Sequence, residues 1–299
     1  MKTVLITGGT GLIGSTLRSL LKKKGYNYRL LSTRKKLSNT SDNTFYWNPA
    51  NGEIDAAAFD DVDVIVHLAG STVNQPWTKS GKESILQSRL QSTNLLKESL
   101  TSVKKIPLII TASATGIYPD LGDEWVDEDQ TPDDDFLADV VVKWEKATLE
   151  LSAYCDRLVT MRIGVVLSSR GGAFPLMAKA TKYWVGSPFG KGDQYMSWIH
   201  ATDVAEFIYF SINNEHVSGV YNTVAANPET NGDFMMELAT AMDKPFFLPN
   251  IPQFLLKLVL GERANILLKG VRASNQKIAS TGFEYRFPHI QKVFNHSKV

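Results

Sequence analysis

Short apolar runs alternate with amphipathic stretches through the first half of the chain. Val4–Thr7, Tyr28–Ser32 and Val62–Leu68 have the length and apolar character of buried strands. Leu12–Lys24 and Ser84–Leu100 repeat their apolar residues at helical spacing, and Gly25 closes the first of these helices. This alternation predicts β-α-β units around a parallel sheet.

The same pattern continues to about residue 170 and then changes. Pro107–Ala112 and Leu158–Leu167 are predicted strands, and Asp135–Tyr154 is a predicted helix between them. Glycines and prolines then interrupt residues 171–195. The later predicted elements are a strand at Met196–His200, a helix from Thr202-Asp203, a strand at Val220–Val224 and a helix at Asn231–Met242.

Helices without matching strands near the end of the chain indicate a smaller lobe beside the sheet. We therefore predict a Rossmann-type doubly wound α/β fold formed by residues 1–170 and 198–226. Residues 171–197 and 227–299 are predicted to form a substrate lobe over the carboxyl edge of the sheet, where such folds bind ligands.

Composition narrows the class of protein. The chain of 299 residues is 43% hydrophobic and 21% charged, which is typical of a folded domain, and its net charge of +1 gives no electrostatic reason to bind nucleic acid or an anionic membrane. The single cysteine excludes an internal disulfide, and we find no signal peptide or membrane span. We expect a cytoplasmic monomer or homodimer whose partner is a small-molecule substrate.

A glycine-rich turn lies directly between the first predicted strand and the first predicted helix. Gly8 permits the tight turn, Gly11 lets the backbone approach a diphosphate, and Gly14 allows close packing of the helix. Helix N-terminal amides then face the phosphates. We expect a dinucleotide to contact Gly8, Thr10, Gly11, Leu12, Ile13 and Gly14.

Charge at the end of the second strand distinguishes the two nicotinamide dinucleotides. NAD sites place an acidic residue about 20 residues beyond the glycines, yet no Asp or Glu occurs from Ser15 to Ser41. The strand ends instead in Thr33, Arg34 and Lys35, and a guanidinium there can bind a 2′-phosphate. These residues predict NADP(H); the alternative is a solvated basic turn.

Several motifs together resemble the extended short-chain dehydrogenase/reductase superfamily, and within it the "epimerase family" branch with a small C-terminal domain of unknown function. The motifs are Gly8-x-x-Gly11-x-x-Gly14, His67-Leu68-Ala69-Gly70, Ala112-Ser113-Ala114-Thr115, Gly116-Ile117-Tyr118-Pro119-Asp120, Lys143-Trp144-Glu145, Arg162-Ile163-Gly164-Val165 and Trp198-Ile199-His200. The resemblance covers nearly the whole chain.

This resemblance implies further contacts with NADP(H). Beyond the glycine turn they fall at Thr33, Arg34, Leu68, Ala69 and Arg89. We also expect contacts at Lys35 and Gly70, and we expect Arg162, Gly164 and Val165 to shape the nicotinamide end. For Arg89 the alternative is an ordinary solvated arginine on a helix.

The same resemblance raises a catalytic question. Superfamily members use a Ser or Thr together with Tyr-x-x-x-Lys on the following helix. Ser113 matches the first element, but alignment places Phe136 and Val140 where the Tyr and Lys belong. Neither of these side chains transfers a proton, so the usual pair is missing.

Two other residues are candidate substitutes. Tyr118 follows Ser113 in the next loop and is predicted as the acid/base, or alternatively as an aromatic packed against the lobe. Lys143 is predicted to lower the pKa of that phenol or bind a phosphate, or alternatively to be a surface lysine paired with Glu145 or Asp139.

The remaining features predict no metal. The five histidines are scattered and have no cysteine partner, and the acidic segment 120–135 lacks the spacing of a calcium loop and is predicted to be solvated. Trp77, Trp184 and Trp198 line a substrate pocket or belong to the core.

These observations lead to one prediction with one alternative. The prediction is an NADP(H)-dependent oxidoreductase or epimerase of a small polar substrate, a carbonyl compound or a sugar nucleotide. The alternative is a catalytically silent NADP(H)-binding sensor or interaction protein, which the missing Tyr-x-x-x-Lys pair favours.

Overall fold

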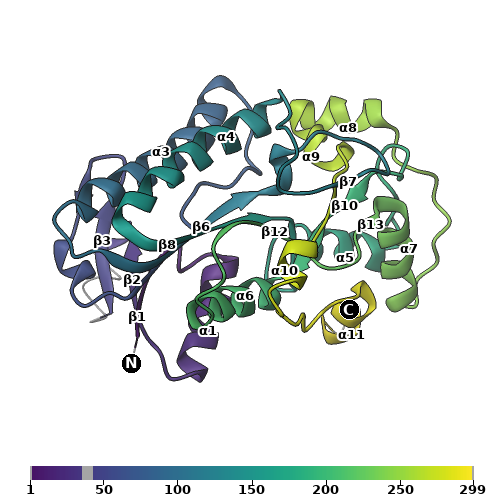
Figure 1. Cartoon of the computed structure of the whole chain (residues 1–299). Helices are drawn as coiled ribbons and strands as arrows, with labels where there is room; N and C mark the ends of the chain where they lie inside the picture. The colour runs from purple at the N-terminus through teal and green to yellow at the C-terminus, as the bar shows by residue number, and fades with distance from the viewer. Residues whose placement is uncertain (1, 36–42, 298–299) are drawn as a thin grey trace. The chain divides into compact units, whose positions relative to one another are not determined.

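An eight-stranded sheet in the order β12-β8-β6-β5-β1-β2-β3-β4 forms the largest element of the protein (Figure 1). The computed structural model describes residues 2–35 and 43–297. The strands of this sheet are β1 (Thr3–Thr7), β2 (Asn27–Ser32), β3 (Thr44–Asn48), β4 (Glu53–Ile54), β5 (Val64–His67), β6 (Ile106–Ala114), β8 (Cys155–Ile163) and β12 (Gly219–Thr223).

The strand order confirms the predicted fold class. β1 pairs in parallel with both β2 and β5, β2 pairs in parallel with β3, and β5 with β6. The order β3-β2-β1-β5-β6-β8 is that of a doubly wound Rossmann fold, and the direction of winding reverses between β1 and β5. Ligands of such folds bind outside the carboxyl ends of the strands at this reversal.

Helices cover both faces of the sheet. α3 (Lys79–Leu100) and α4 (Phe136–Leu149) lie together on one face, and α1 (Leu12–Lys23) and α6 (Ala201–Asn213) lie on the other (Figure 1). Short 3-10 helices η1 (Ala56–Phe59) and η3 (Glu150–Tyr154) complete this region. The core under α3 contains Leu5, Ile65, Leu95, Leu96 and Ile109, all at most 6% exposed, so apolar burial holds the helix to the sheet.

The chain divides into two compact units. The first comprises Met1–Ala114, Asp135–Arg162 and Val204–Tyr221, and the second Thr115–Asp134, Ile163–Asp203 and Asn222–Val299. The sequence placed the acidic segment in the first part, whereas the structure assigns it to the second unit. The reason is local: Asp133 forms an ion pair of 2.6 Å with Lys269, and Asp120 accepts from the Gly270 amide at 2.9 Å.

The second unit contains short strand ladders as well as helices. β9 pairs in parallel with β11, β7 in parallel with β14, and β10 antiparallel with β13. Its core contains Phe174, Trp198, Phe234, Ile290 and Phe294. Its elements are η2 (Thr115–Ile117), β7 (Trp125–Val126), β9 (Val165–Leu167), α5 (Phe174–Lys182), β10 (Tyr195–Met196), β11 (Trp198–His200), β13 (Glu229–Thr230), α7 (Asn231–Ala241), α8 (Gln253–Leu260), η4 (Gly261–Ala264), α9 (Asn265–Leu268), β14 (Arg272–Ala273), α10 (Gln276–Ala279) and α11 (Ile290–Ser297).

Within the described residues, no helix combines the length and the hydropathy that crossing a membrane requires.

Candidate functional site

The glycine turn joins β1 to α1 at the point where the winding reverses. Gly8 has a φ of +67°, and the Gly11 amide donates to the Gly8 carbonyl at 3.0 Å. A Cβ at Gly14 would lie 2.4 Å from the Gly8 oxygen, so only glycine lets the helix approach its own turn so closely. Gly11 has no side chain with which to cap α1, and the first-turn amides of this helix therefore suit an anion.

A second small-residue segment follows β5 on the neighbouring strand. The amides of Leu68 and Ala69 both donate to the hydroxyl of Thr7, each at 3.1 Å, which fixes this segment against the end of β1. A Cβ at Gly8 would lie 2.7 Å from the Leu68 oxygen. The two segments thus form a cradle that additional side-chain atoms would fill.

Arg89 of α3 lies beside this cradle. Its Nη1 donates to the carbonyl oxygens of Ile85 at 2.8 Å and Ser71 at 3.2 Å, and its guanidinium lies over the Trp144 ring, 4.9 Å from the centroid. Burial lowers the pKa of Arg89 to about 10, so it remains a cation at neutral pH. Among the described residues, no carboxylate pairs with Arg89.

Position 70 and the Trp144 indole complete the surroundings of this guanidinium. A Cβ at Gly70 would lie 3.4 Å from Arg89. The buried Nε1 of Trp144 has no hydrogen-bond partner in the described part of the chain. A partly buried cation to which the described residues offer no carboxylate favours an anionic ligand.

The basic segment after β2 is exposed, as an adenosine-phosphate contact requires. Thr33, Arg34 and Lys35 are all exposed; the Arg34 amide donates to Ser32 Oγ at 3.2 Å, and Lys35 lies over the Tyr46 ring. Arg18 is a cation near the turn that the sequence did not single out. Its Nη1 donates to the Gly9 carbonyl at 3.4 Å, and a helical arginine carries no sequence signal for such a contact.

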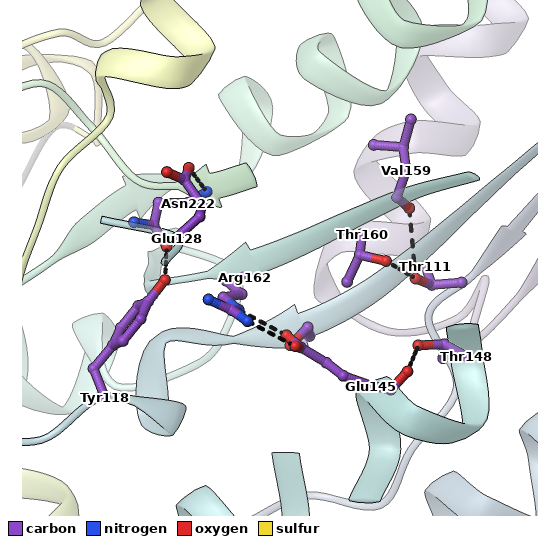
Figure 2. Close-up of polar contacts among 10 residues, drawn as sticks. Thr111, Tyr118, Glu128, Glu145, Thr148, Val159, Thr160, Arg162 and Asn222 are labelled. Atoms are coloured by element: carbon purple, nitrogen blue, oxygen red, sulfur yellow. Dashed lines mark hydrogen bonds and ion pairs between the residues drawn. The ribbon is translucent and has the colours of Figure 1, made fainter. Parts of the chain in front are cut away.

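Ser113, at the end of β6, is hydrogen-bonded to a buried ion pair. Its Oγ lies 2.5 Å from Glu145 Oε1 on α4. Arg162 of β8 binds the same carboxylate through two contacts of 2.8 Å, Nε to Oε1 and Nη2 to Oε2 (Figure 2). The sequence predicted Ser113 and Arg162 as site residues but missed Glu145, which reads as the polar face of a helix.

Tyr118 and Lys143 have ordinary structural contacts. Tyr118 is fully buried in the second unit, where its hydroxyl donates to Asn222 Oδ1 at 2.6 Å (Figure 2). Lys143 is half exposed in the first unit and pairs with Asp139 at 2.7 Å, one turn earlier on α4. Both contacts agree with the alternatives that the sequence left open, and the predicted catalytic roles remain predictions.

Phe136 and Val140, which align with the Tyr and Lys of the superfamily, both have apolar surroundings in the structure. Phe136 packs edge-on against Trp77 with ring centroids 5.0 Å apart, and Val140 is buried.

Gly164 and Val165 lie in the second unit, where β9 pairs with β11. The Val165 amide donates to the Ser197 carbonyl at 2.8 Å. Their predicted cofactor contact remains a prediction.

Of the two other tryptophans that the sequence singled out, one lies in the core and one on the surface. Trp198 is fully buried and its Nε1 donates to the Asn227 carbonyl, whereas Trp184 is 56% exposed. Within the described ranges, no group of three or more His, Cys, Asp and Glu residues is arranged to hold a metal ion.

Comparison with known families shows to which family this chain belongs. Residues 4–223 match the NAD dependent epimerase/dehydratase family. The chain belongs to this epimerase family. Residues 251–297 also match a domain of unknown function, DUF1731, which agrees with the C-terminal domain that the motifs implied.

Curated relatives described as epimerase family proteins match nearly the whole chain. An epimerase family protein of Staphylococcus aureus is 36% identical over 293 residues, which are 97% of each chain. An epimerase family protein of Staphylococcus epidermidis is 34% identical over 298 residues, 99% of this chain and 98% of that one.

Solved structures of the epimerase family have the same fold. The human epimerase family protein SDR39U1, crystallised with NADPH, is 30% identical and superposes with a TM-score of 0.87 over 99% of both chains. A nucleoside-diphosphate sugar epimerase from Corynebacterium glutamicum is 31% identical with a TM-score of 0.81, over 99% of this chain and 58% of that one.

Proposed function

We propose that this protein binds NADP(H) at the carboxyl ends of β1 and β5 and acts as an oxidoreductase or epimerase on a small polar substrate. The observation that carries the proposal is the cradle formed by the start of α1 and the Leu68–Gly70 segment, beside the Arg89 cation for which the described residues supply no carboxylate. The human relative crystallised with NADPH supports the choice of ligand.

Different residues of the first unit are suited to different parts of the dinucleotide. The amides of the glycine turn suit its diphosphate, and the exposed guanidinium of Arg34 suits a 2′-phosphate. Arg89 would supply positive charge beside the small-residue segment. When bound, the cofactor would supply a hydride donor or acceptor; the protein's part is to bind, orient and hydrogen-bond the reacting group.

Ser113 is the residue that we expect to contact the reacting oxygen of the substrate. The roles proposed for Tyr118 and Lys143 each have a condition: the phenol must leave Asn222, and the ammonium must leave Asp139. Two measurements on Tyr118→Phe, Lys143→Met and Ser113→Ala test all three roles: NADPH oxidation with a panel of carbonyl compounds, and NADP+ reduction with a panel of sugar nucleotides. Unchanged rates in Tyr118→Phe and Ser113→Ala would contradict these roles.

Isothermal titration calorimetry with NADPH and NADH tests the proposed function directly. We expect saturable heat with NADPH and weaker binding of NADH. No heat with either nucleotide would contradict the proposal.

A second candidate function is a catalytically silent NADP(H)-binding protein. Phe136 and Val140 favour it, because α4 presents no proton donor where the superfamily has its Tyr and Lys. NADPH binding without turnover of any panel member would favour this candidate over the first.

A further inference from the structure

Ser113, Glu145 and Arg162 form a polar triad within the first unit. Ser113 is 3% exposed, and the Glu145 and Arg162 side chains are 16% and 10% exposed. Oε1 of Glu145 receives both Ser113 Oγ at 2.5 Å and Arg162 Nε at 2.8 Å, and Oε2 receives Arg162 Nη2 at 2.8 Å. The triad therefore combines a bidentate ion pair with one hydroxyl.

The chemistry of the triad fixes the direction of its hydroxyl hydrogen bond. Arg162 donates to both oxygens of Glu145, which is the geometry of an ion pair with a carboxylate, and carboxylate oxygens accept hydrogen bonds and donate none. Ser113 must therefore donate to Glu145, and a serine has only one hydroxyl hydrogen. What Ser113 retains for any other group is the pair of acceptor positions on Oγ.

We propose that Ser113 meets its ligand as a hydrogen-bond acceptor, and that the ligand group at this position is an alcohol O–H and not a carbonyl oxygen. This inference rests on the proposed function in one respect, namely that a substrate binds at the carboxyl end of β6. It names the class of substrate that this position selects: the carbinol side of an alcohol–carbonyl pair.

A carbonyl at the same position is disfavoured for a physical reason. Its lone pairs would face those of Ser113, unless the hydroxyl turned away from Glu145 to donate to it. Turning away would break a hydrogen bond to a charged acceptor, which is among the stronger kinds in proteins. We expect the alcohol to bind at least about tenfold more tightly than the matched ketone.

Glu145 and Arg162 act through Ser113 and are positioning residues. Arg162 holds the carboxylate in one orientation, and the carboxylate holds the hydroxyl hydrogen away from the ligand. Glu145→Gln changes this with little change in shape. With the amide oxygen at the Oε1 position, Ser113 donates to a neutral and therefore weaker acceptor; with the amide nitrogen there, the Ser113 hydrogen is released. In both orientations a ligand carbonyl competes better for this hydrogen than it does in the wild type.

The direction of the hydrogen bond is testable without any ligand. In Ser113→Cys, the infrared S–H stretch reports whether the new thiol donates to a carboxylate, and subtraction of the wild-type spectrum removes the band of Cys155. We expect the band of the introduced thiol at a lower frequency than that of a free thiol, and a return toward the free value in Ser113→Cys/Glu145→Gln. A free-thiol frequency in the single variant, unchanged by the second substitution, would overturn the proposal.

The ligand class is tested with a matched pair of probes, tetrahydropyran-4-ol and tetrahydropyran-4-one. Saturation-transfer NMR titrations give the dissociation constants for the wild type, Ser113→Ala, Glu145→Gln and the control Glu150→Gln. Glu150 belongs to an exposed ion pair with Lys97, so the control removes the same charge elsewhere. Melting temperatures of all four proteins verify that each is folded.

The expected pattern is specific to the hydrogen-bond direction. The wild type and Glu150→Gln should prefer the alcohol at least about tenfold, Ser113→Ala should lose the preference, and Glu145→Gln should reduce or reverse it. Equal or tighter binding of the ketone by the wild type would overturn the ligand class, as would the absence of any Ser113-dependent binding. Failure of NADPH to bind contradicts only the proposed function, because the infrared measurement uses the unliganded chain.

Discussion

The hydroxyl of Thr7 donates to Nδ1 of the fully buried His67, 2.7 Å away, because Thr7 Oγ1 already accepts from the amides of Leu68 and Ala69. This arrangement fixes the tautomer of His67. Its hydrogen is on Nε2, which faces Thr93 Oγ1 at 3.1 Å. The conformation of the segment after β5 therefore depends on a neutral imidazole.

Stability should consequently fall in mild acid. Complete burial lowers the pKa of His67 to about 4, whereas it titrates near 6.5 in an unfolded chain. Between these values the unfolded state binds more protons, so the free energy of unfolding decreases as the pH falls from 6.5 towards 4, by about 3 kcal/mol for this residue. Urea denaturation at a series of pH values measures the slope.

His67→Gln removes that titration and should reduce the slope, whatever its effect on stability at neutral pH; the remainder comes from His200, whose pKa burial also lowers to about 4. His216→Gln, at an exposed histidine, should leave the slope as in the wild type. Equal slopes in all three proteins would contradict the burial argument.

Removing the guanidinium after β2 should change cofactor preference. We expect Arg34→Ala to weaken NADPH binding about tenfold or more and NADH binding much less, because only NADPH carries a 2′-phosphate. Calorimetry with both nucleotides measures the ratio, and Lys23→Ala, at the exposed end of α1, controls for the loss of one positive charge. Equal weakening of both nucleotides by Arg34→Ala would favour NAD(H).

A methyl group at position 14 should open the glycine turn. In Gly14→Ala the new Cβ would lie 2.4 Å from the Gly8 oxygen, so turn and helix must separate. We expect a loss of about 1–3 kcal/mol in the free energy of unfolding and at least about tenfold weaker NADPH binding. Gly52→Asn, in an open turn where asparagine tolerates the positive φ, should change neither.

Arg89→Met should affect stability and binding in opposite directions. Removing a partly buried cation, to which the described residues offer no carboxylate, is expected to leave the unliganded protein as stable or more stable. NADPH and NADH binding should both weaken, about tenfold, because the phosphates near the small-residue segment are common to both. Unchanged binding of both nucleotides would show that Arg89 is structural.

The sequence predicted most strands of the large sheet, because their apolar runs are long enough to be distinctive. It extended one of them too far: Leu158–Leu167 divides into β8 and β9 at Gly164. A Cβ at Gly164 would lie 2.1 Å from the Ser197 oxygen, so the division reflects the close approach of a distant segment. No sequence pattern around Gly164 indicates that approach. The short aromatic strand β3 was missed because it has no period-two alternation.

In the candidate site, too, the sequence predicted what local geometry requires and missed what depends on a distant residue. Glycines at fixed spacing predicted the turn, because backbone geometry requires them locally. Glu145 has no such local signal: on α4 it is followed by Lys146 and reads as a solvated position. Its role depends on Arg162, which reaches it from a strand of the sheet.

Neither compact unit is a continuous stretch of chain. The first is assembled from three segments, and its edge strand β12 begins only at Gly219. During synthesis the sheet therefore cannot be completed until most of the polypeptide has left the ribosome. No single cut of the chain separates the two units, so studying one unit in isolation requires circular permutation or loop grafting instead of truncation.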